Sequence, residues 1–425
     1  MNTYAVVLAG GIGKRFSPFK ASKPLFSLMG LSLIERTVKK LKNAGFEDVV
    51  IVSNERDEKK IKALFNSDEK LKVVVQKTPR GMADALISSE DLIKDGSAFV
   101  LNATDQVDQS VFNLAFKKAK EGKSFITGKK VSDYFDGGYL KLEGNRVVEV
   151  VEKPGKGNEP SDLVNLVFHF FSSANNFINL LKNTQSGKDD VYEVAFSKLM
   201  QEEEVGLLKY EGYWQSTKYP WDILKISSAL LKHELEPKDL SKNIHPSAVI
   251  DKNVFLGEGV IVYENAVIKG PSYIGQNTII GNNAFIRESY VGNDSIVGSF
   301  SEVARSYVGD SCWLHNNYVG DSVLEENIAF GAGTITGNYR LDEKSIKVSI
   351  KEEKVDSGKD HLGALIAKDV RVGINVSLMP GVKIGSNSVI GPAILIQDDV
   401  EDNTRVFSSH QNLIKKPFQG KINPR

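Results

Sequence analysis

The chain has 425 residues, and its 54 basic and 54 acidic residues give a formal net charge of zero. This length predicts two or more domains, each with a substantial core, and the balanced charge disfavours a dedicated binder of nucleic acid or of membrane surfaces. The single cysteine, Cys312, excludes an internal disulfide, and no apolar run is long enough for a membrane span or resembles a signal peptide. We therefore expect a cytoplasmic protein in which Cys312 is a small core residue.

The first strand and the loop after it carry the strongest local signal. Residues 5–8 form a short apolar run that predicts a buried parallel strand, and three glycines follow it within five positions. Glycine lets the backbone turn tightly and approach a ligand, and free N–H groups past the end of a strand form a good anion site. Arg15 and Lys23 add cationic side chains that can reach phosphates.

Two well-known phosphate loops do not fit this stretch. A Walker A loop requires Gly-Lys-Ser/Thr, but Gly13-Lys14 is followed by Arg15. The dinucleotide-binding fingerprint requires a third glycine at the position of Phe16.

Strand-like and helical runs alternate from residue 1 to about residue 235, which we expect to form the first domain. Strands are predicted at 49–52, 73–75 and 98–101, and helices at 33–44, 58–65, 82–92 and 221–235. This alternation predicts βαβ units and a mostly parallel sheet, with ligands bound at the carboxyl ends of the strands.

The opening resembles the sugar-1-phosphate nucleotidylyltransferase family, whose first motif reads approximately L-A-G-G-x-G-x-R…P…P-K-P-L. The chain has Leu8-Ala-Gly-Gly-Ile-Gly-Lys-Arg15, Pro18 and Lys23-Pro24-Leu25. The resemblance implies a Rossmann-like α/β domain that converts an NTP and a sugar-1-phosphate into an NDP-sugar and pyrophosphate. Arg15, Lys23 and Asp105 would be catalytic, with Asp105 holding Mg²⁺.

The resemblance continues along the domain and implies two sets of binding residues. The nucleotide would be bound by Leu8, Ala9, Gly10, Gly11, Gly13, Arg15, Gln76, Gly81 and Met82. The sugar phosphate would be bound by Lys23, Gly138, Glu152, Lys153 and Asn165.

The chain also departs from the family pattern. Met82 replaces a threonine of the base-reading segment, and Val167 replaces a glycine. Ser216 stands where the family pattern Trp-x-Asp-Ile-Gly-x-Pro has its aspartate, which is commonly the second metal ligand. A serine hydroxyl is a poorer ligand for Mg²⁺ than a carboxylate. These departures leave a rival open, namely a non-catalytic regulatory or scaffold protein that binds sugar nucleotides.

The sequence changes character after a polar linker at 236–243. Aliphatic residues recur every six positions, as at Ile250, Leu256, Val262, Ile268, Ile274, Ile280 and Ile286, and again from Ile366 to Ile396. A period of six fits neither a helix nor an ordinary strand; it is typical of a left-handed parallel β-helix of hexapeptide repeats, which we expect at 244–396. The polar interruption at about 336–362 predicts an extruded loop. The tail at 397–425 is expected to form no further coil.

β-Helices of this type commonly form trimers, and many are acetyl-CoA-dependent acyltransferases. Residues 314–322 and 331–339 resemble segments of bifunctional N-acetylglucosamine-1-phosphate uridyltransferase/glucosamine-1-phosphate acetyltransferases, including archaeal-type homologues. This resemblance implies a homotrimer or a higher multiple and an acetyl-transfer site with His315 as its base, built from Arg287, His315, Tyr318, Ala332 and Asn338. Ala304 replaces a lysine that holds the acceptor phosphate in the family. Two further readings stay open: a glucose-1-phosphate thymidylyltransferase or a mannose-1-phosphate guanylyltransferase whose β-helix serves only for assembly.

Overall fold

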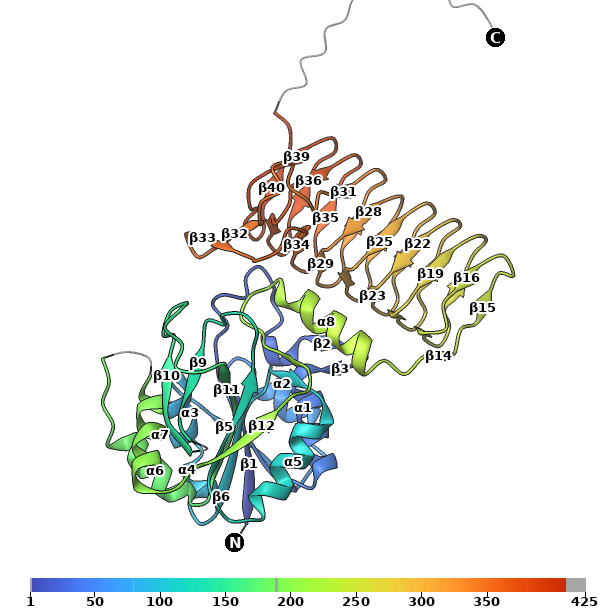
Figure 1. Cartoon of the computed structure of the whole chain (residues 1–425). Coiled ribbons are helices and arrows are strands. Elements are labelled where there is room, and N and C mark those ends of the chain that lie inside the picture. Colours follow the sequence, from blue (N-terminus) through green and yellow to red (C-terminus); the bar gives the residue numbers. More distant parts are fainter. Residues whose placement is uncertain (1, 79, 145, 188–189, 410–425) are drawn as a thin grey trace, which may run out of the picture. The chain divides into compact units, whose positions relative to one another are not determined.

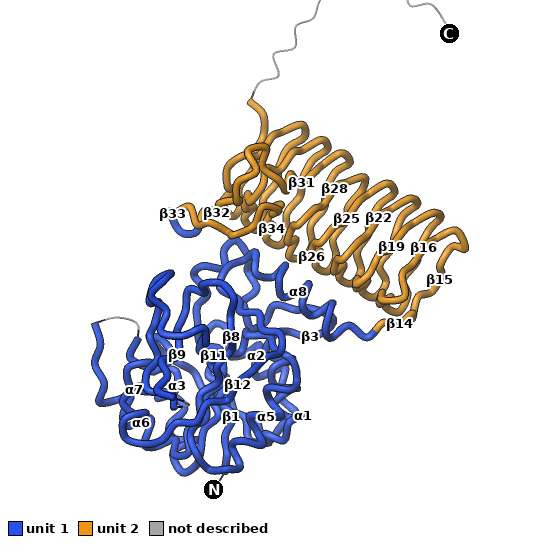
Figure 2. The backbone as a smooth tube through the Cα atoms, viewed as in Figure 1, with its two compact units in different colours: residues 1–236, 350–353 blue, residues 237–349, 354–425 orange. Residues whose placement is uncertain are grey.

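The protein is described by a computed structural model over residues 2–78, 80–144, 146–187 and 190–409 (Figure 1). The chain forms two compact units, residues 1–236 with 350–353 and residues 237–349 with 354–425 (Figure 2). The first is an α/β unit and the second is a stack of β-helical coils.

The first unit is built around one mixed sheet with the strand order β10-β9-β11-β6-β1-β4-β5, to which β8 and β12 add beside β11. Its strands are β1 (Thr3–Ala9), β4 (Asp48–Ser53), β5 (Leu71–Val75), β6 (Ser97–Asn102), β8 (Phe125–Lys130), β9 (Gly138–Glu143), β10 (Arg146–Glu152), β11 (Leu163–Phe171) and β12 (Gly206–Tyr210). Strands β6, β1, β4 and β5 are parallel, so their carboxyl ends share one edge of the sheet. Two short pairs, β2 (Ser27–Leu28) with β3 (Leu31–Ser32) and β7 (Gln106–Val107) with β13 (Trp214–Gln215), lie outside it.

Helices pack on both faces of this sheet. They are α1 (Leu33–Ala44), α2 (Glu58–Leu64), α3 (Gly81–Ile87), α4 (Glu90–Ile93), α5 (Gln109–Ala119), α6 (Ala174–Lys182), α7 (Val191–Glu202) and α8 (Asp222–His233), with the short 3₁₀ helix η1 (Lys23–Leu25). Alternation along β1 sends Val6 and Leu8 into one core cluster and Ala5 and Val7 into the other. The predicted βαβ organisation is therefore confirmed.

Local signals fix most helix boundaries. Helix α1 begins with a capping box in which Ser32 and Glu35 bond each other's backbone N–H groups, and it ends at Gly45 with φ of 106°. The single helix expected at 82–92 is instead two helices, α3 and α4. Ser88 and Ser89 donate their hydroxyls to the carbonyls of Asp84 and Leu86, and this local bonding competes with a continuous helix.

Three parallel sheets form the walls of the second unit, one strand of each per coil. The first sheet holds β14 (Lys238–Asp239), β17 (Val254–Leu256), β20 (Ser272–Ile274), β23 (Tyr290–Val291), β26 (Tyr307–Val308), β29 (Val323–Leu324), β34 (Leu365–Ile366) and β37 (Lys383–Ile384). The second holds β15 (Asn243–Ile244), β18 (Ile261–Val262), β21 (Ile279–Ile280), β24 (Ile296–Val297), β27 (Trp313–Leu314), β30 (Ala329–Phe330), β35 (Arg371–Val372), β38 (Val389–Ile390) and β40 (Arg405–Val406). The third holds β16 (Val249–Ile250), β19 (Val267–Lys269), β22 (Phe285–Arg287), β25 (Glu302–Ala304), β28 (Tyr318–Gly320), β31 (Ile335–Thr336), β36 (Ser377–Leu378) and β39 (Leu395–Ile396).

The aliphatic residues of the hexad pattern point inward and form one continuous core cluster from Val254 to Val400. Glycines follow many of them because neighbouring coils approach closely there. A Cβ on Gly275, for example, would lie 2.5 Å from the carbonyl carbon of Gly292 in the next coil. The predicted left-handed β-helix is thus confirmed.

Buried hydroxyl groups form a second internal feature of the coils. The backbone N–H of Ser289 donates to the Oγ of Ser272, and the same bond repeats from Ser306 to Ser289, from Ser322 to Ser306 and from Ala364 to Ser322. These bonds satisfy corner N–H groups that would otherwise be buried without a partner. Cys312 is fully buried in the core, and burial raises the pKa of its thiol to about 12.

Two expectations about the ends of the β-helix need correction. Most of the linker expected at 236–243 belongs to the first coil, because β14 and β15 already pair with β17 and β18. The coil pattern also does not stop at Ile396: after a register shift of two residues, Val400 and Val406 stand six residues apart and pack against the core, and β40 pairs with β38. The rest of the tail, residues 410–425, lies outside the described residues.

The interruption expected as an extruded loop contains a two-stranded hairpin, β32 (Lys347–Ile350) with β33 (Glu353–Asp356). The parallel pairing between neighbouring coils continues across this hairpin, because Val323 pairs with Leu365 and Ile335 with Ser377. Ile346 packs against Gly381 at the base of this insertion.

The inward stack predicts a sharp contrast between two isoleucines. Ile384 is fully buried, whereas Ile374 is 54% exposed. We expect Ile384→Ala to lower the free energy of unfolding by about 3 kcal/mol, since it leaves a cavity in a packed core, and Ile374→Ala to lower it by less than about 1 kcal/mol. Urea unfolding of the two variants measures this, and equal losses would contradict the described core.

Candidate active site

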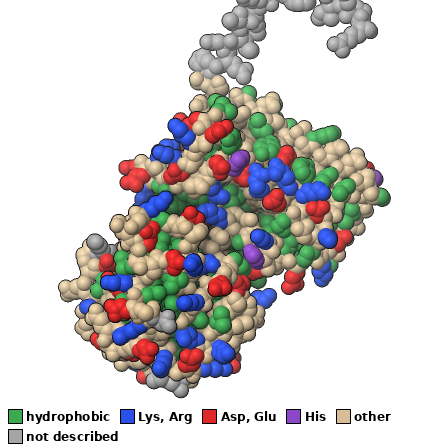
Figure 3. Space-filling view, viewed as in Figure 1, with side chains coloured by type: hydrophobic (Ala, Val, Ile, Leu, Met, Phe, Trp, Pro, Cys, Tyr) green, Lys and Arg blue, Asp and Glu red, His purple; other side chains and the backbone are tan. Residues whose placement is uncertain are grey.

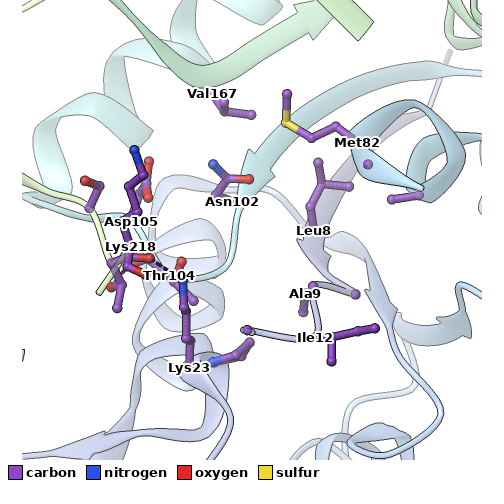
Figure 4. A pocket seen from close by; sticks show the side chains of 18 of the residues that line it. Leu8, Ala9, Ile12, Lys23, Met82, Asn102, Thr104, Asp105, Val167 and Lys218 are labelled. Atoms are coloured by element: carbon purple, nitrogen blue, oxygen red, sulfur yellow. Dashed lines mark hydrogen bonds between the residues drawn. The ribbon is translucent and has the colours of Figure 1, made fainter. Parts of the chain in front are cut away.

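A cavity of about 680 Å³ opens in the first unit where strands β1, β5 and β6 end (Figure 4). It is lined by Leu8, Ala9, Gly10, Gly11, Ile12, Gly13, Lys14, Lys23, Pro24, Gln76, Gly81, Met82, Ala85, Asn102, Thr104, Asp105, Phe135, Asn165, Val167, Trp214, Ser216, Thr217 and Lys218.

The cavity has a charged side and an apolar side. Figure 4 shows Asp105, Lys23 and Lys218 on one side and Leu8 and Met82 on the other. Such a division suits a ligand with one charged end and one flat, weakly polar end, as a nucleotide has.

The glycine loop lies directly against Gln76, which follows β5, two strands away from β1 in the sheet. A Cβ on Gly10 would lie 2.3 Å from the Oε1 of Gln76, so only glycine fits there without moving that side chain. Gln76 is itself held, because its Nε2 donates to the carbonyl of Gly81 at 3.1 Å and to Asp84 Oδ2 at 2.9 Å. Gly13 and Gly81 have φ of 70° and 86°, a region that favours glycine. At these glycines the loop therefore presents backbone to the cavity, while Ile12 and Lys14 add side chains.

Lys23 connects the start of the chain to a distant segment. Its Nζ donates to the carbonyl oxygens of Thr217 at 2.8 Å and Lys218 at 3.1 Å. The pKa of Lys23 is lowered from 10.5 to about 8, mainly by burial; the charge of Asp222 opposes this shift, and the positive charge of Arg15 contributes to it. An anion bound beside this ammonium would offset the cost of burying it.

Asp105 is the one carboxylate among the described residues that line the cavity. It lies just past β6, is 7% exposed, and accepts a hydrogen bond from Trp214 Nε1 at 3.3 Å. Burial raises its pKa from 3.8 to about 6, although hydrogen bonds from Trp214 and Asn102 act in the opposite direction. The cavity therefore holds a carboxylate whose charge has no full compensation in the protein alone.

These donors fit one Mg²⁺ ion rather than two. Mg²⁺ is commonly held by one or two carboxylates together with substrate phosphates and water, and Asp105 supplies one carboxylate. Ser216 can add only a hydroxyl, and Asp222 is not among the residues that line the cavity; its Oδ2 accepts from the backbone N–H groups of Lys218 and Tyr219 at 2.8 and 2.7 Å. Within the described ranges, no group of three His, Cys, Asp or Glu side chains could hold a metal ion.

Asn165 lines the cavity, and a hydrogen bond to His169 fixes the orientation of its side chain. Its Oδ1 lies 2.8 Å from His169 Nε2, and His169 Nδ1 lies 2.9 Å from the hydroxyl of Tyr192. Burial lowers the pKa of His169 to about 3, so the ring is neutral. Because Asn165 Oδ1 can only accept, Nε2 carries the proton, and the amide nitrogen of Asn165 is the donor that this side chain can offer to a ligand.

The other expected sugar-phosphate residues lie behind Asn165 or at the surface. Gly138 packs against Glu152 and Asn165, and a Cβ there would lie 3.2 Å from Glu152 Oε2. Lys153 is exposed and pairs with Glu152 at 3.4 Å. Arg15 is also exposed and does not line the cavity, although its charge acts on both Lys23 and Asp136.

Sequence reasoning missed several lining residues. Phe135, Trp214 and Lys218 come from segments far from the glycine loop, and only their contacts reveal them: the rings of Phe135 and Trp214 meet edge to face at 4.8 Å. Lys218 stands two positions after Ser216, where the family pattern has a glycine and so gives no signal for a cation.

The β-helix brings part of the expected acetyl-transfer set together. Asn338 Nδ2 donates to the hydroxyl of Tyr318 at 3.2 Å and to Asp321 Oδ2 at 2.6 Å, and Arg305 forms two bonds to the same Asp321. The side chain of His315 is exposed at a coil corner.

The two arginines that could replace the missing phosphate-binding lysine are both paired. Arg287 donates from Nε and Nη2 to Glu302 Oε1 at 3.0 and 2.9 Å, and Arg305 is neutralised by Asp321. Ala332 is exposed and offers the cluster no polar side chain. Each arginine would have to exchange a carboxylate for a phosphate in order to bind an acceptor.

Comparison with known families decides the classification. Residues 4–233, more than half of the chain, match the nucleotidyl transferase family. The chain belongs to this family. Residues 238–356 of the nucleotidyl transferase match the GMPPB C-terminal domain, and residues 363–392 match the bacterial transferase hexapeptide (six repeats).

Relatives match this nucleotidyl transferase over nearly its whole length. "Bifunctional protein GlmU" of Methanocaldococcus jannaschii is 32% identical over 97% of the chain and 99% of its own length. "Bifunctional protein GlmU" of Methanococcus vannielii is also 32% identical, with the same coverage. "Bifunctional sugar-1-phosphate nucleotidylyltransferase/acetyltransferase" of Sulfurisphaera tokodaii is 30% identical over 93% of the chain and 98% of its own length. The protein is thus an enzyme, and the family resemblance seen in the sequence is confirmed.

Across the part of the nucleotidyl transferase that the structure describes, every helix is too short or too polar to cross a membrane.

The buried carboxylate of Asp105 should lower the stability of the folded protein when it is charged. Asp105 has a higher pKa in the folded protein, about 6, than its ordinary value of 3.8. The folded state therefore binds more protons between these values, and the charged carboxylate costs stability above about pH 6. We expect Asp105→Asn to raise the free energy of unfolding by on the order of 2–3 kcal/mol at pH 7.5 in EDTA, and to have little effect near pH 4.

Urea unfolding at the two pH values measures this, with Asp162→Asn as the control. Asp162 is an exposed aspartate whose pKa is lowered by Lys130, so its replacement should not increase stability. A loss of stability in Asp105→Asn at pH 7.5 would show that the carboxylate supports the fold.

Proposed function

We propose that the first unit transfers a nucleotidyl group from an NTP to a sugar-1-phosphate and releases pyrophosphate. The observation that carries this proposal is a single cavity in which the glycine loop, the ammonium of Lys23 and the carboxylate of Asp105 meet beside an apolar wall. The two substrates would each supply phosphate to the charged side, and the base would lie against Leu8 and Met82.

The reaction needs in-line attack of a sugar phosphate oxygen on the α-phosphorus, with pyrophosphate leaving on the opposite side. Little covalent work falls to the protein, so catalysis depends on positioning and on compensation of charge. Backbone N–H groups of the loop and Arg15 would bind the leaving pyrophosphate, and Lys23 the transferring phosphate. Bound Mg²⁺, held by Asp105, would supply further neutralisation of the phosphates. Asn165 would donate to the sugar, and Gly138, Glu152 and Lys153 would support this end of the site.

The names of the relatives suggest the substrate class. The relative from Sulfurisphaera tokodaii is named a sugar-1-phosphate nucleotidylyltransferase/acetyltransferase, and we propose a UDP-N-acetylglucosamine-type product for this chain. We assign these roles to residues 1–236 and to the β-helical coils from β14 to β40. We also propose that the enzyme works in the cytoplasm, in keeping with its single buried cysteine.

The direct test is pyrophosphate release with Mg²⁺ across a panel of UTP, CTP, dTTP, GTP and ATP with N-acetylglucosamine-1-phosphate, glucose-1-phosphate and mannose-1-phosphate. A preference for UTP with N-acetylglucosamine-1-phosphate supports the proposal. Sugar-nucleotide binding without turnover of any pair would favour a regulatory or scaffold role instead.

Arg15 offers a matched pair of variants. Because Arg15 is exposed, Arg15→Ala should lower turnover by about 100-fold or more while changing the free energy of unfolding by less than about 0.5 kcal/mol. Arg340→Ala removes an exposed arginine of the hairpin segment and should leave turnover unchanged. Full turnover in Arg15→Ala would remove this residue from the site.

For the second unit, we propose a homotrimer with acetyl-CoA-dependent acetylation of glucosamine-1-phosphate. Outward-facing apolar residues in register along one wall, Ile261, Ile279, Ile296 and Trp313, support association, and Trp313 is 53% exposed. Figure 3 shows hydrophobic side chains at the surface of the β-helix among charged ones. Sedimentation equilibrium at micromolar concentration tests the trimer.

His315 would remove a proton from the attacking amine, beside Tyr318 and Asn338. Histidine suits this role because its ordinary pKa of about 6.5 lies close to working pH. Because both nearby arginines are paired, we expect slow acetylation with a high KM. His315→Ala should abolish acetyl-CoA consumption and leave pyrophosphate release and oligomeric state unchanged, whereas His245→Ala, which removes a partly exposed histidine of the β-helix, should have no effect. Equal acetylation in the two variants would make His315 structural.

A further inference from the structure

Lys218 is a cation of the cavity that the family pattern does not supply. It lines the cavity two positions after Ser216. Its backbone is fixed there, because its carbonyl accepts from Lys23 Nζ, and the preceding Thr217 donates from Oγ1 to the carbonyl of Thr104 at 3.1 Å. The main chain at Lys218 is therefore held beside Lys23, while its own ammonium lies at the end of a longer, partly exposed side chain.

The charges that line the cavity are unbalanced. Among the lining residues that the structure describes are the lysines Lys14, Lys23 and Lys218 but the single carboxylate Asp105. The charge of Lys218 is close enough to lower the pKa of Lys23. Two neighbouring ammonium groups repel each other unless an anion lies between them, so this arrangement favours a bound phosphate.

The present partner of Lys218 is weakly held. Lys218 Nζ pairs with Asp136 Oδ2 at 2.6 Å, and the two side chains are 30% and 54% exposed. Asp136 lies between β8 and β9, next to Phe135, whose ring packs against Trp214. An exposed ion pair contributes little net free energy, so a doubly charged phosphate can displace the carboxylate from Lys218.

We infer that Lys218 is a phosphate-binding residue of the active site. Its positive charge stands in for a second metal ion, which Ser216 cannot help to hold. Asp136 competes with the substrate phosphate for Lys218. The ligand is a phosphate group of the sugar-1-phosphate or of the NTP. This inference rests on the proposed nucleotidyl transfer and adds to it a residue and a competing carboxylate.

The two members of the ion pair should act in opposite directions. Lys218→Ala should raise KM by about 10-fold to 100-fold, because a charge-assisted contact to phosphate is lost. Asp136→Asn should lower the same KM by about 2-fold to 5-fold, because Lys218 loses its competitor. In the Lys218→Ala background, Asp136→Asn should have no effect. Lys218→Arg should restore most of the affinity, since it keeps the charge.

Measuring KM separately for the NTP and the sugar-1-phosphate identifies which phosphate is bound, and a change in either supports the inference. The control is another exposed pair of the same unit, Lys130 with Asp162 at 2.8 Å, which does not line the cavity. Lys130→Ala and Asp162→Asn should leave both KM values unchanged. Wild-type KM values in Lys218→Ala, or a higher KM in Asp136→Asn, would overturn the inference.

Binding without turnover separates this inference from the proposed reaction. Calorimetric titration of the full chain in EDTA with N-acetylglucosamine-1-phosphate, and separately with UTP, reports the contribution of Lys218 in the absence of metal. Weaker binding of either ligand to Lys218→Ala, and tighter binding to Asp136→Asn, would support the anion site even if pyrophosphate release were never observed. Unchanged affinities for both ligands would overturn it even if the wild type were active.

Discussion

The cavity of the first unit depends on one buried ammonium group. Lys23 bonds to two carbonyl oxygens that lie 194 and 195 residues further along the chain, and so joins the segment after the glycine loop to the segment that carries Trp214, Ser216 and Lys218. Each of these bonds is charge-assisted and largely shielded from water, which makes it stronger than an exposed equivalent. The charged wall of the cavity therefore has a fixed shape before a substrate arrives.

That fixed shape carries an electrostatic cost which a ligand can reduce. Burial favours the neutral form of both groups: it lowers the pKa of the Lys23 ammonium and raises the pKa of the Asp105 carboxyl. A phosphate and a metal ion would restore the solvation that each group has lost. The site is thus arranged for charged ligands, and part of their binding free energy comes from relief of this desolvation.

The sequence predicted those features that depend on residue type at a fixed spacing. The six-residue aliphatic period specified the β-helix, and the glycine loop specified the cavity, because no other side chain fits beside Gln76. Features built from distant polar pairs could not be predicted. Lys218 and Asp136 are 82 residues apart, and nothing local links them. The serine bonds inside the coils were equally hidden, since a buried serine and an exposed one look alike in a sequence.

The hairpin of β32 and β33 shows that inserted residues cost the β-helix little stability. Between neighbouring coils, Ser322 bonds back to Ser306 across 16 residues, yet Ala364 makes the same bond to Ser322 across 42 residues. Because the entropy of loop closure grows only with the logarithm of length, the additional residues cost about 1 kcal/mol. Corners of the coil are therefore places where evolution can lengthen the protein and vary its surface chemistry without disturbing the stack of strands on either side.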